Sequence, residues 1–166
     1  VKSGDGLRLA VMKAASYGDV FAIAQALCAQ GRGSAKLADV ARIAQQSAAL
    51  VLSTLGSAFD VIDAGWIASA PAIKSAQNDL LENLKTFHAA HPLKRFAPRA
   101  EMVNRAQSPM LTRYVENTLA KAGDIRIAEG QIGLATHDPA AAMTPLQRDR
   151  MADIDNGHGC LTVAYK

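Results

Sequence analysis

Residues 80–134 constrain the fold of this chain most, because proline and glycine divide the segment into short amphipathic pieces. Apolar residues recur at three- and four-residue steps from Ile73 to Phe87, which predicts a helix with one buried face. Pro92 disfavours helical backbone in the residue before it, so we expect this helix to end near His91.

A turn separates two further predicted helices. Pro98 can occupy the first turn of the second helix, where the missing N–H of proline costs no hydrogen bond. Ser108 can cap the third helix, with Pro109 at its first position, and Gly123 supplies a left-handed stop at its other end. The buried faces would consist of Met102, Val103 and Ala106 in the second helix and of Leu111, Val115, Leu119 and Ala122 in the third.

Two short strands complete the segment. Ile125 and Ile127 alternate with a polar residue, and after Glu129-Gly130 a second alternation brings Ile132 and Leu134 to one face. Each strand therefore has one buried side, and together they predict a β-hairpin. Three helices followed by a hairpin is the order of a winged-helix domain, a variant of the helix-turn-helix motif.

The first 70 residues repeat this order. Asp19 is a natural N-cap before an apolar helix, and helices over 37–44 and 48–55 follow the glycine-rich loop at 31–34. Two apolar runs then flank Asp63-Ala64-Gly65, which is typical of a hairpin turn.

We therefore predict a mainly α protein with small β-hairpins, an α+β fold of tandem winged-helix domains with two separate small cores. The first domain would span residues 1–70 and the second residues 71–136. Residues 137–166 would form a linker and the truncated start of a third winged-helix domain, with Thr144 capping its first helix.

Two parts of the chain carry a family resemblance. The first is LKTFHAAHPL over 84–93, followed by PRAE over 98–101. The second consists of AGDI over 122–125, Gly130, Leu134, His137-Asp138 and TPLQ over 144–147. These runs resemble the second winged-helix domain of the bacterial selenocysteine-specific translation elongation factors and the start of the domain after it.

The resemblance implies a GTP-dependent factor that delivers selenocysteinyl-tRNA to the ribosome at a recoded UGA codon. GTP and Mg would belong to the full-length protein, because no Walker A motif is present in these residues. In that family the final domain of the C-terminal arm grips the mRNA hairpin. This chain would be a monomeric spacer and hinge in the arm, not an enzyme, with accessory contacts to ribosomal RNA or tRNA.

The residues suited to chemistry form no catalytic set. His88 and His91 could approach one metal ion, but no third ligand is close in sequence. We favour a buried His88 beside the core and a His91 at the helix end, where it suits the helix dipole. His137-Asp138 could pair in a loop but lacks a nucleophile, and Cys28 is interpreted as a small buried filler. We therefore expect no catalytic residue, metal or cofactor in this chain.

Basic residues are concentrated in the second predicted domain. The segment from Lys85 to Lys121 contains seven basic and two acidic residues. Seven minus two gives a charge of +5, which exceeds the whole chain's net charge of +3. A cationic face on the third helix could contact phosphates, as in DNA-binding relatives, or could be an ordinary solvated face. The candidate nucleic-acid-binding residues are Lys94, Arg95, Arg99, Arg105, Arg113, Asn117 and Lys121.

The corresponding helix of the first domain, over 47–55, carries no charge. Phosphate attraction dominates nucleic-acid affinity, so this helix is expected to pack on a protein surface or on a neighbouring domain. Two other functions therefore stay open. One is a dimeric winged-helix transcription regulator that binds duplex DNA, and the other is a protein-interaction module that uses the uncharged helix.

The remaining sequence features bound the setting of the protein. No apolar run reaches the roughly 20 residues that span a bilayer, and no signal peptide is recognisable. The two cysteines lie far apart in sequence, which favours a reduced protein. We therefore expect a cytoplasmic protein without a membrane partner.

Overall fold

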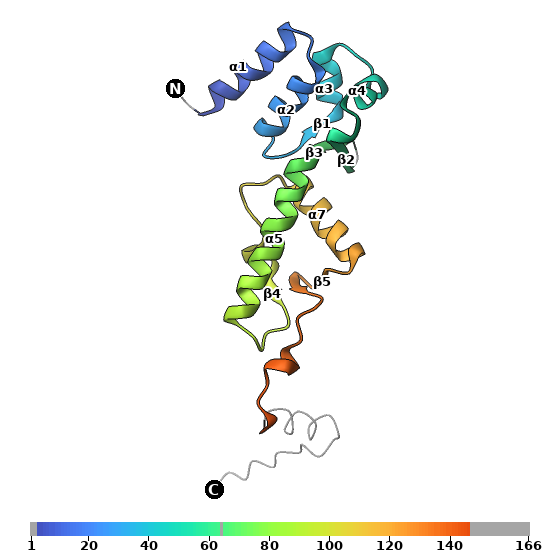
Figure 1. Cartoon of the computed structure of the whole chain (residues 1–166). Coiled ribbons are helices and arrows are strands. Elements are labelled where there is room, and N and C mark those ends of the chain that lie inside the picture. The colour runs from blue at the N-terminus through green and yellow to red at the C-terminus, as the bar shows by residue number, and fades with distance from the viewer. Residues whose placement is uncertain (1–2, 64, 147–166) are drawn as a thin grey trace.

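The computed structural model describes residues 3–63 and 65–146, which form two similar series of elements (Figure 1). The first series consists of α1 (Ser3–Ser16), α2 (Val20–Gln30), β1 (Ala35–Lys36), α3 (Leu37–Ala44), α4 (Ala48–Leu55), the 3-10 helix η1 (Gly56–Ala58), β2 (Phe59–Asp63) and β3 (Trp66–Ser69). The second consists of α5 (Ala70–Ala90), β4 (Ala97–Pro98), α6 (Arg99–Met102), α7 (Pro109–Ala122), β5 (Ile125–Ala128), β6 (Gln131–Leu134) and the 3-10 helix η2 (Pro139–Ala142). The predicted α+β class, mainly helical with small hairpins, is confirmed. Most of the predicted start of a third domain, from residue 147 onward, lies outside the described residues.

Each series ends in a hairpin that a two-residue strand widens into a three-stranded antiparallel sheet. The strand orders are β1-β3-β2 and β4-β6-β5. Both predicted hairpins are confirmed. In the second turn Glu129 and Gly130 both have positive φ, 44° and 79°, as the tightest right-twisted hairpins require. Sequence analysis missed β1 and β4, because two residues are too few to show an alternation.

Four of the predicted helix ends are confirmed, at Asp19, His91, Ser108 and Gly123. The Asp19 side chain accepts a hydrogen bond from the Ala22 amide at 3.0 Å, which caps α2. Helix α5 ends at Ala90 with His91 as its C-cap, as the proline after it predicts. Helix α7 begins after Ser108 and ends at Gly123, whose φ of 82° is left-handed.

The predicted second helix of the second series is shorter than expected. Pro98 belongs to β4, and α6 has four residues and ends at Met102. Val103 has extended backbone, and Ala106 is exposed rather than buried. The Asn104 side chain accepts a hydrogen bond from the Ala106 amide at 2.9 Å, a local turn that competes with helical hydrogen bonding.

Two hydrophobic cores form, but they share the first hairpin. Successive residues of a strand point to opposite faces, so Ile67 of β3 packs in the first core and Ala68 packs in the second. Ile62 of β2 also joins the second core. Both cores are apolar and tightly closed, with Ile23 fully buried in the first and Leu84 fully buried in the second. Two cores form, as predicted, and the β2–β3 hairpin lies between them and contributes residues to both.

Candidate nucleic-acid interface

The structure distributes the seven candidate residues over three places. One is the loop between α5 and β4, at the end of the second series that is far from α1 (Figure 1). Another is a hollow beside α6, and the third is a hollow along α7. Lys94 and Arg95 lie in the first, Arg99 and Arg105 in the second, and Arg113, Asn117 and Lys121 in the third.

The loop after α5 holds two cations over aromatic rings. The Lys94 ammonium lies 5.9 Å from the centre of the Phe87 ring, and the Arg95 guanidinium lies 5.9 Å from the centre of the Phe96 ring. Attraction of a cation to a ring face is worth about 0.5–1 kcal/mol at exposed sites. Both cations stay exposed to solvent and are therefore accessible to an anion.

Helix α7 turns its cations away from the core but not wholly toward solvent. Leu111, Val115 and Leu119 are buried on one side, as predicted from their spacing. On the opposite side Arg113 forms an ion pair with Asp63, which comes from the β2–β3 hairpin of the first series. The first cation of this face is therefore already paired with a carboxylate. A duplex groove would have to compete with that carboxylate for it.

Arg99 is paired even more closely. Its guanidinium donates two hydrogen bonds, of 2.6 and 2.8 Å, to the two carboxylate oxygens of Glu116 on α7. The Glu116 side chain is only 5% exposed, whereas that of Arg99 is 46% exposed. The hydrogen bonds and the charge of Glu116 raise the pKa of Arg99. This fork joins α6 to α7 and balances the charge of Arg99 on one side.

The loop between α2 and β1 packs against the beginning of α7. The hydroxyl oxygens of Ser34 and Ser108 lie 2.5 Å apart, and both side chains are buried. The Ser108 amide donates to the Arg32 carbonyl at 2.8 Å. Gly33 has a φ of 101°, which favours glycine, and an added Cβ would come within 2.7 Å of the Leu111 side chain. We call this contact the junction. The sequence predicts only a loop over residues 31–34, because nothing local signals a partner 74 positions away.

An open hollow of about 490 Å³ lies beside the junction. Three arginines line it, Arg32 from the first series and Arg99 and Arg105 from the second. The Arg32 guanidinium donates to the backbone carbonyl of Arg105 at 3.4 Å. Among the described residues, no carboxylate side chain lines this hollow. Arg32 was not among the predicted residues, and its place between Gly31 and Gly33 was the only signal for it.

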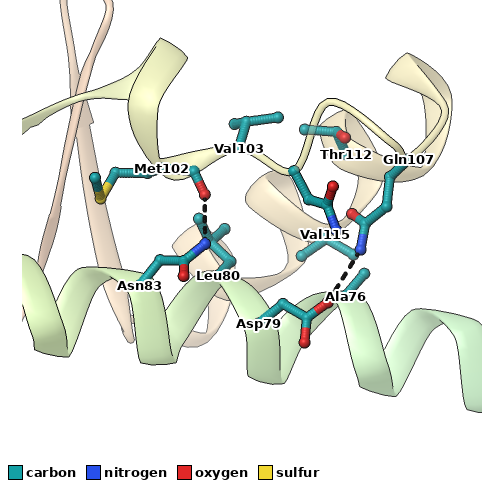
Figure 2. Close-up of a pocket in the computed structure, with 10 residues that line it drawn as sticks. Ala76, Asp79, Leu80, Asn83, Met102, Val103, Gln107, Thr112 and Val115 are labelled. Atoms are coloured by element: carbon teal, nitrogen blue, oxygen red, sulfur yellow. Dashed lines mark hydrogen bonds between the residues drawn. The ribbon is translucent and has the colours of Figure 1, made fainter.

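The segment that carries Arg105 is tied to α5 across a narrow crevice of about 10 Å³ (Figure 2). The Asn83 side chain donates to the Met102 carbonyl at 3.0 Å. The Gln107 side chain donates to the Asp79 carboxylate at 3.4 Å. The crevice has room for about one water molecule and no larger ligand. The two hydrogen bonds across the crevice therefore hold the loop before α7 in place.

The residues with potential for chemistry make structural contacts, and of these residues His88 and Cys28 are buried. His88 is 5% exposed and its ring stacks on His137, with ring centres 3.9 Å apart. Burial and electrostatic repulsion by His137 lower the pKa of His88, and a hydrogen bond to the Lys94 carbonyl opposes this shift. Burial raises the pKa of Cys28 to about 11, which makes the thiol unreactive. Asp138 bonds the Ala140 amide at 3.0 Å in the loop that follows β6.

Two further observations concern the described residues as a whole. Within residues 3–63 and 65–146, no three side chains among histidine, cysteine, aspartate and glutamate gather as a metal ion would require. In the same residues, none of the helices combines the length and apolar character needed to cross a bilayer. No protein-family model matches the sequence, and no curated protein matches it either.

Proposed function

We propose that this chain is part of the C-terminal arm of a selenocysteine-specific translation elongation factor. It would comprise two tandem winged-helix domains, over residues 1–70 and 71–136, and the start of a third over residues 137–166. The observation that carries the proposal is the repeated order of helix, short strand, two helices and hairpin, each closing a three-stranded antiparallel sheet. The resemblance at 84–93, 98–101 and 122–134 falls on the second of these units, and the resemblance at 137–138 and 144–147 falls on the start of the third.

The arm would act as a spacer of defined length. The ion pair of Asp63 with Arg113, the hydroxyl contact of Ser34 with Ser108 and the shared β2–β3 hairpin all resist bending between the two units. A GTPase body and an mRNA-binding end joined by such a piece would keep a fixed separation. In this role the chain is a cytoplasmic, non-catalytic monomer, and GTP and Mg act elsewhere in the full-length factor.

Its contacts with ribosomal RNA or tRNA would be accessory and would not read sequence. Lys94 and Arg95 are exposed, and Arg105 makes no ion pair within the described residues. Exposed cations that meet phosphates position an RNA but do not specify bases. The relevant test is filter binding of this chain to the mRNA hairpin of its own organism and to a scrambled hairpin. Weak, salt-sensitive and equal binding of both is expected, and tight binding of the natural hairpin alone would contradict the spacer role.

A test of the arm itself uses the full-length factor and a UGA-readthrough reporter. Deleting residues 71–136, which removes one unit, should abolish readthrough while leaving GTP hydrolysis intact. Replacing the Ser34 and Ser108 pair by alanine should lower readthrough by loosening the spacer. Unchanged readthrough after the deletion would contradict the proposal.

A transcription regulator that binds duplex DNA remains the second candidate, supported by the row of Arg113, Asn117 and Lys121 on α7. The pairing of Arg113 with Asp63 weakens it. It predicts a salt-sensitive shift of duplex DNA that is lost on Arg113→Ala, and a symmetric dimer. A protein-interaction module is the third candidate, supported by Leu50 of α4, which is 52% exposed. That function predicts no nucleic-acid binding even at low salt.

A further inference from the structure

The hollow beside the junction has the composition of a nucleotide site. Arg32 and Arg105 supply two positive charges from two different parts of the fold, and Arg99 supplies a third guanidinium. A guanidinium has five N–H donors, and Glu116 accepts from two nitrogen atoms of Arg99. Donors on Arg99 therefore stay available, and Glu116 sets their direction. Phosphate oxygens are the ligands that such converging guanidinium groups recognise best.

The backbone at Arg32 adds an independent indication. Its φ is 58°, in the left-handed region where a glycine would fit without strain. An arginine at this position costs conformational energy, and its guanidinium reaches the carbonyl of Arg105 across the junction. Residues held in such conformations tend to cluster at ligand sites. The junction thus places a cation at the edge of the hollow at some cost to the loop.

The rest of the lining suits the other parts of a nucleotide. Ala100, Val103 and Pro109 present apolar surface, and Asn104 and Gln107 carry side-chain amides. The volume of about 490 Å³ lies within the range of small-ligand sites, roughly 300–1,000 Å³. Asn104 Oδ1 accepts from the Ala106 amide, and Gln107 Nε2 donates to Asp79. The Asn104 Nδ2 donors and the Gln107 Oε1 acceptor therefore remain to meet the polar edge of a base while the apolar residues meet its face.

We propose that this hollow binds one nucleotide of single-stranded RNA, with its phosphate on Arg32 and Arg105 and its base over Val103 and Pro109. The choice of RNA as ligand rests on the proposed function, whereas the nucleotide chemistry rests on the hollow. A single strand fits because its bases can turn outward into a protein site, and bases paired in a duplex cannot. Arg105 also borders a hollow lined by Asp79, Glu82 and Glu101, so the phosphate lies on the Arg32 side of Arg105.

The direct test is an NMR titration of the ¹⁵N-labelled chain with uridine 5′-monophosphate. Shift changes are expected at the amides of Arg32, Val103, Asn104, Arg105 and Gln107. Uridine and inorganic phosphate are the matched probes, and each should bind about tenfold or more weakly than the nucleotide, because each lacks one half of the recognised group. Equal affinity for inorganic phosphate would overturn the nucleotide assignment. Absence of shifts at these amides would overturn the site.

A second experiment measures the fluorescence anisotropy of a labelled oligouridine titrated with the parent chain and with single-substitution variants. Arg32→Ala and Arg105→Ala should each weaken binding about tenfold, the loss typical of one charge-assisted hydrogen-bonded contact. The matched control is Arg42→Ala, an exposed arginine of α3 that lies outside the hollow and is not one of the candidate residues, and it should change binding less than about twofold. Because both target arginines are exposed, the circular dichroism spectra of the variants should match that of the parent.

The outcomes separate this inference from the proposed function. Oligouridine binding that survives both substitutions would overturn the hollow and leave an RNA-contacting arm intact. Nucleotide binding at the hollow, together with full UGA readthrough after deletion of residues 71–136, would support the hollow and contradict the translational role.

Discussion

The two series of elements differ most in the helix that precedes each hairpin. Helix α4 has eight residues without a charge, and it exposes Leu50. Helix α7 has 14 residues, buries Glu116 against Arg99 and pairs Arg113 with the neighbouring hairpin. The first half is thus held by apolar contacts and one exposed ion pair, Asp39–Arg42, whereas the second adds the pairing of Arg99 with a buried carboxylate.

The connections into these helices differ as well. Residues 45–47 link α3 to α4, and Gln45 makes the turn with a φ of 53°. Residues 103–108 link α6 to α7, and this longer connection carries Asn104 and Arg105 beside the hollow. The second half therefore has a shorter helix at this place, four residues in α6 against eight in α3, and its longer connection lines the hollow.

The largest expected effect is on the free energy of unfolding, and it shows whether the two halves unfold as one cooperative unit. Leu84→Ala and Ile23→Ala each remove a fully buried side chain, one from each core, and should each lower the free energy of unfolding by about 2–5 kcal/mol. Because Ile62 and Ala68 extend the second core into the first hairpin, both variants should shift a single transition in urea. Two transitions, of which each variant moves only one, would show that the halves unfold separately.

The next effect concerns the ion pair of Arg99 with the buried Glu116 carboxylate in the second half. Arg99→Ala leaves the buried Glu116 carboxylate without its partner, which should cost about 1–3 kcal/mol of stability; the half exposure of Arg99 keeps this below the cost of a fully buried pair. Glu116→Gln is the matched control and should cost less, because a neutral amide tolerates burial better. Equal losses in urea unfolding would mean that the geometry of the fork matters more than the buried charge.

A smaller effect compares the two serine caps. Ser47 and Ser108 both accept a hydrogen bond from the amide three residues on, at 3.3 and 3.1 Å. Loss of a cap costs about 0.5–2 kcal/mol. Ser108→Ala should cost more than Ser47→Ala, because Ser108 is buried and also bonds Ser34. Thermal unfolding of the two variants measures this difference in stability. A Ser34→Ala variant should show most of the additional loss of stability expected for Ser108→Ala.

A pH effect should come from the second half alone, because no histidine precedes His88 in the sequence. Its Nε2 accepts from the Leu134 amide at 3.3 Å, and its Nδ1 bonds the Lys94 carbonyl at 3.1 Å. The pKa of His88 is lowered below 6.5 in the folded state. The unfolded chain therefore binds the proton first, so this contribution to stability is complete above pH 6.5 and is lost as the pH falls through the folded pKa. Urea unfolding at pH 7.5 and 5.0 measures the loss, and a His88→Gln variant should reduce it.

Much of the fold could be predicted from local signals. The serine, aspartate and glycine ends of the helices and the Glu129-Gly130 turn each depend on a few neighbouring residues. Two details were predicted wrongly. Ile127 is 44% exposed although it alternates correctly with Ile125, and α6 ends early where the Asn104 side chain accepts a hydrogen bond from the Ala106 amide.

The candidate site shows the same division. The sequence marked Arg99, Arg105 and Arg113 by type and spacing alone. It could not show that Glu116 and Asp63 pair with two of them, since these partners lie 17 and 50 positions away. The sequence also gave no reason to join Arg32 to Arg105, which are 73 positions apart. Spacing therefore predicts which face of a helix a cation occupies, and the tertiary fold decides whether that cation is free.

The smallest expected effect on the free energy of unfolding comes from removing the Asp63–Arg113 ion pair. The same substitution tests duplex binding independently of stability. Both side chains are partly exposed, at 31% and 58%, so Asp63→Asn should change the free energy of unfolding by about 0–1 kcal/mol. The substitution releases Arg113 on the face of α7 that also carries Asn117 and Lys121. If α7 can enter a groove, duplex DNA should then bind more tightly at low salt, and Arg113→Ala in the same background should reverse the gain. Unchanged duplex binding in a fluorescence anisotropy titration would mean that the pair serves only to fix the two halves against each other.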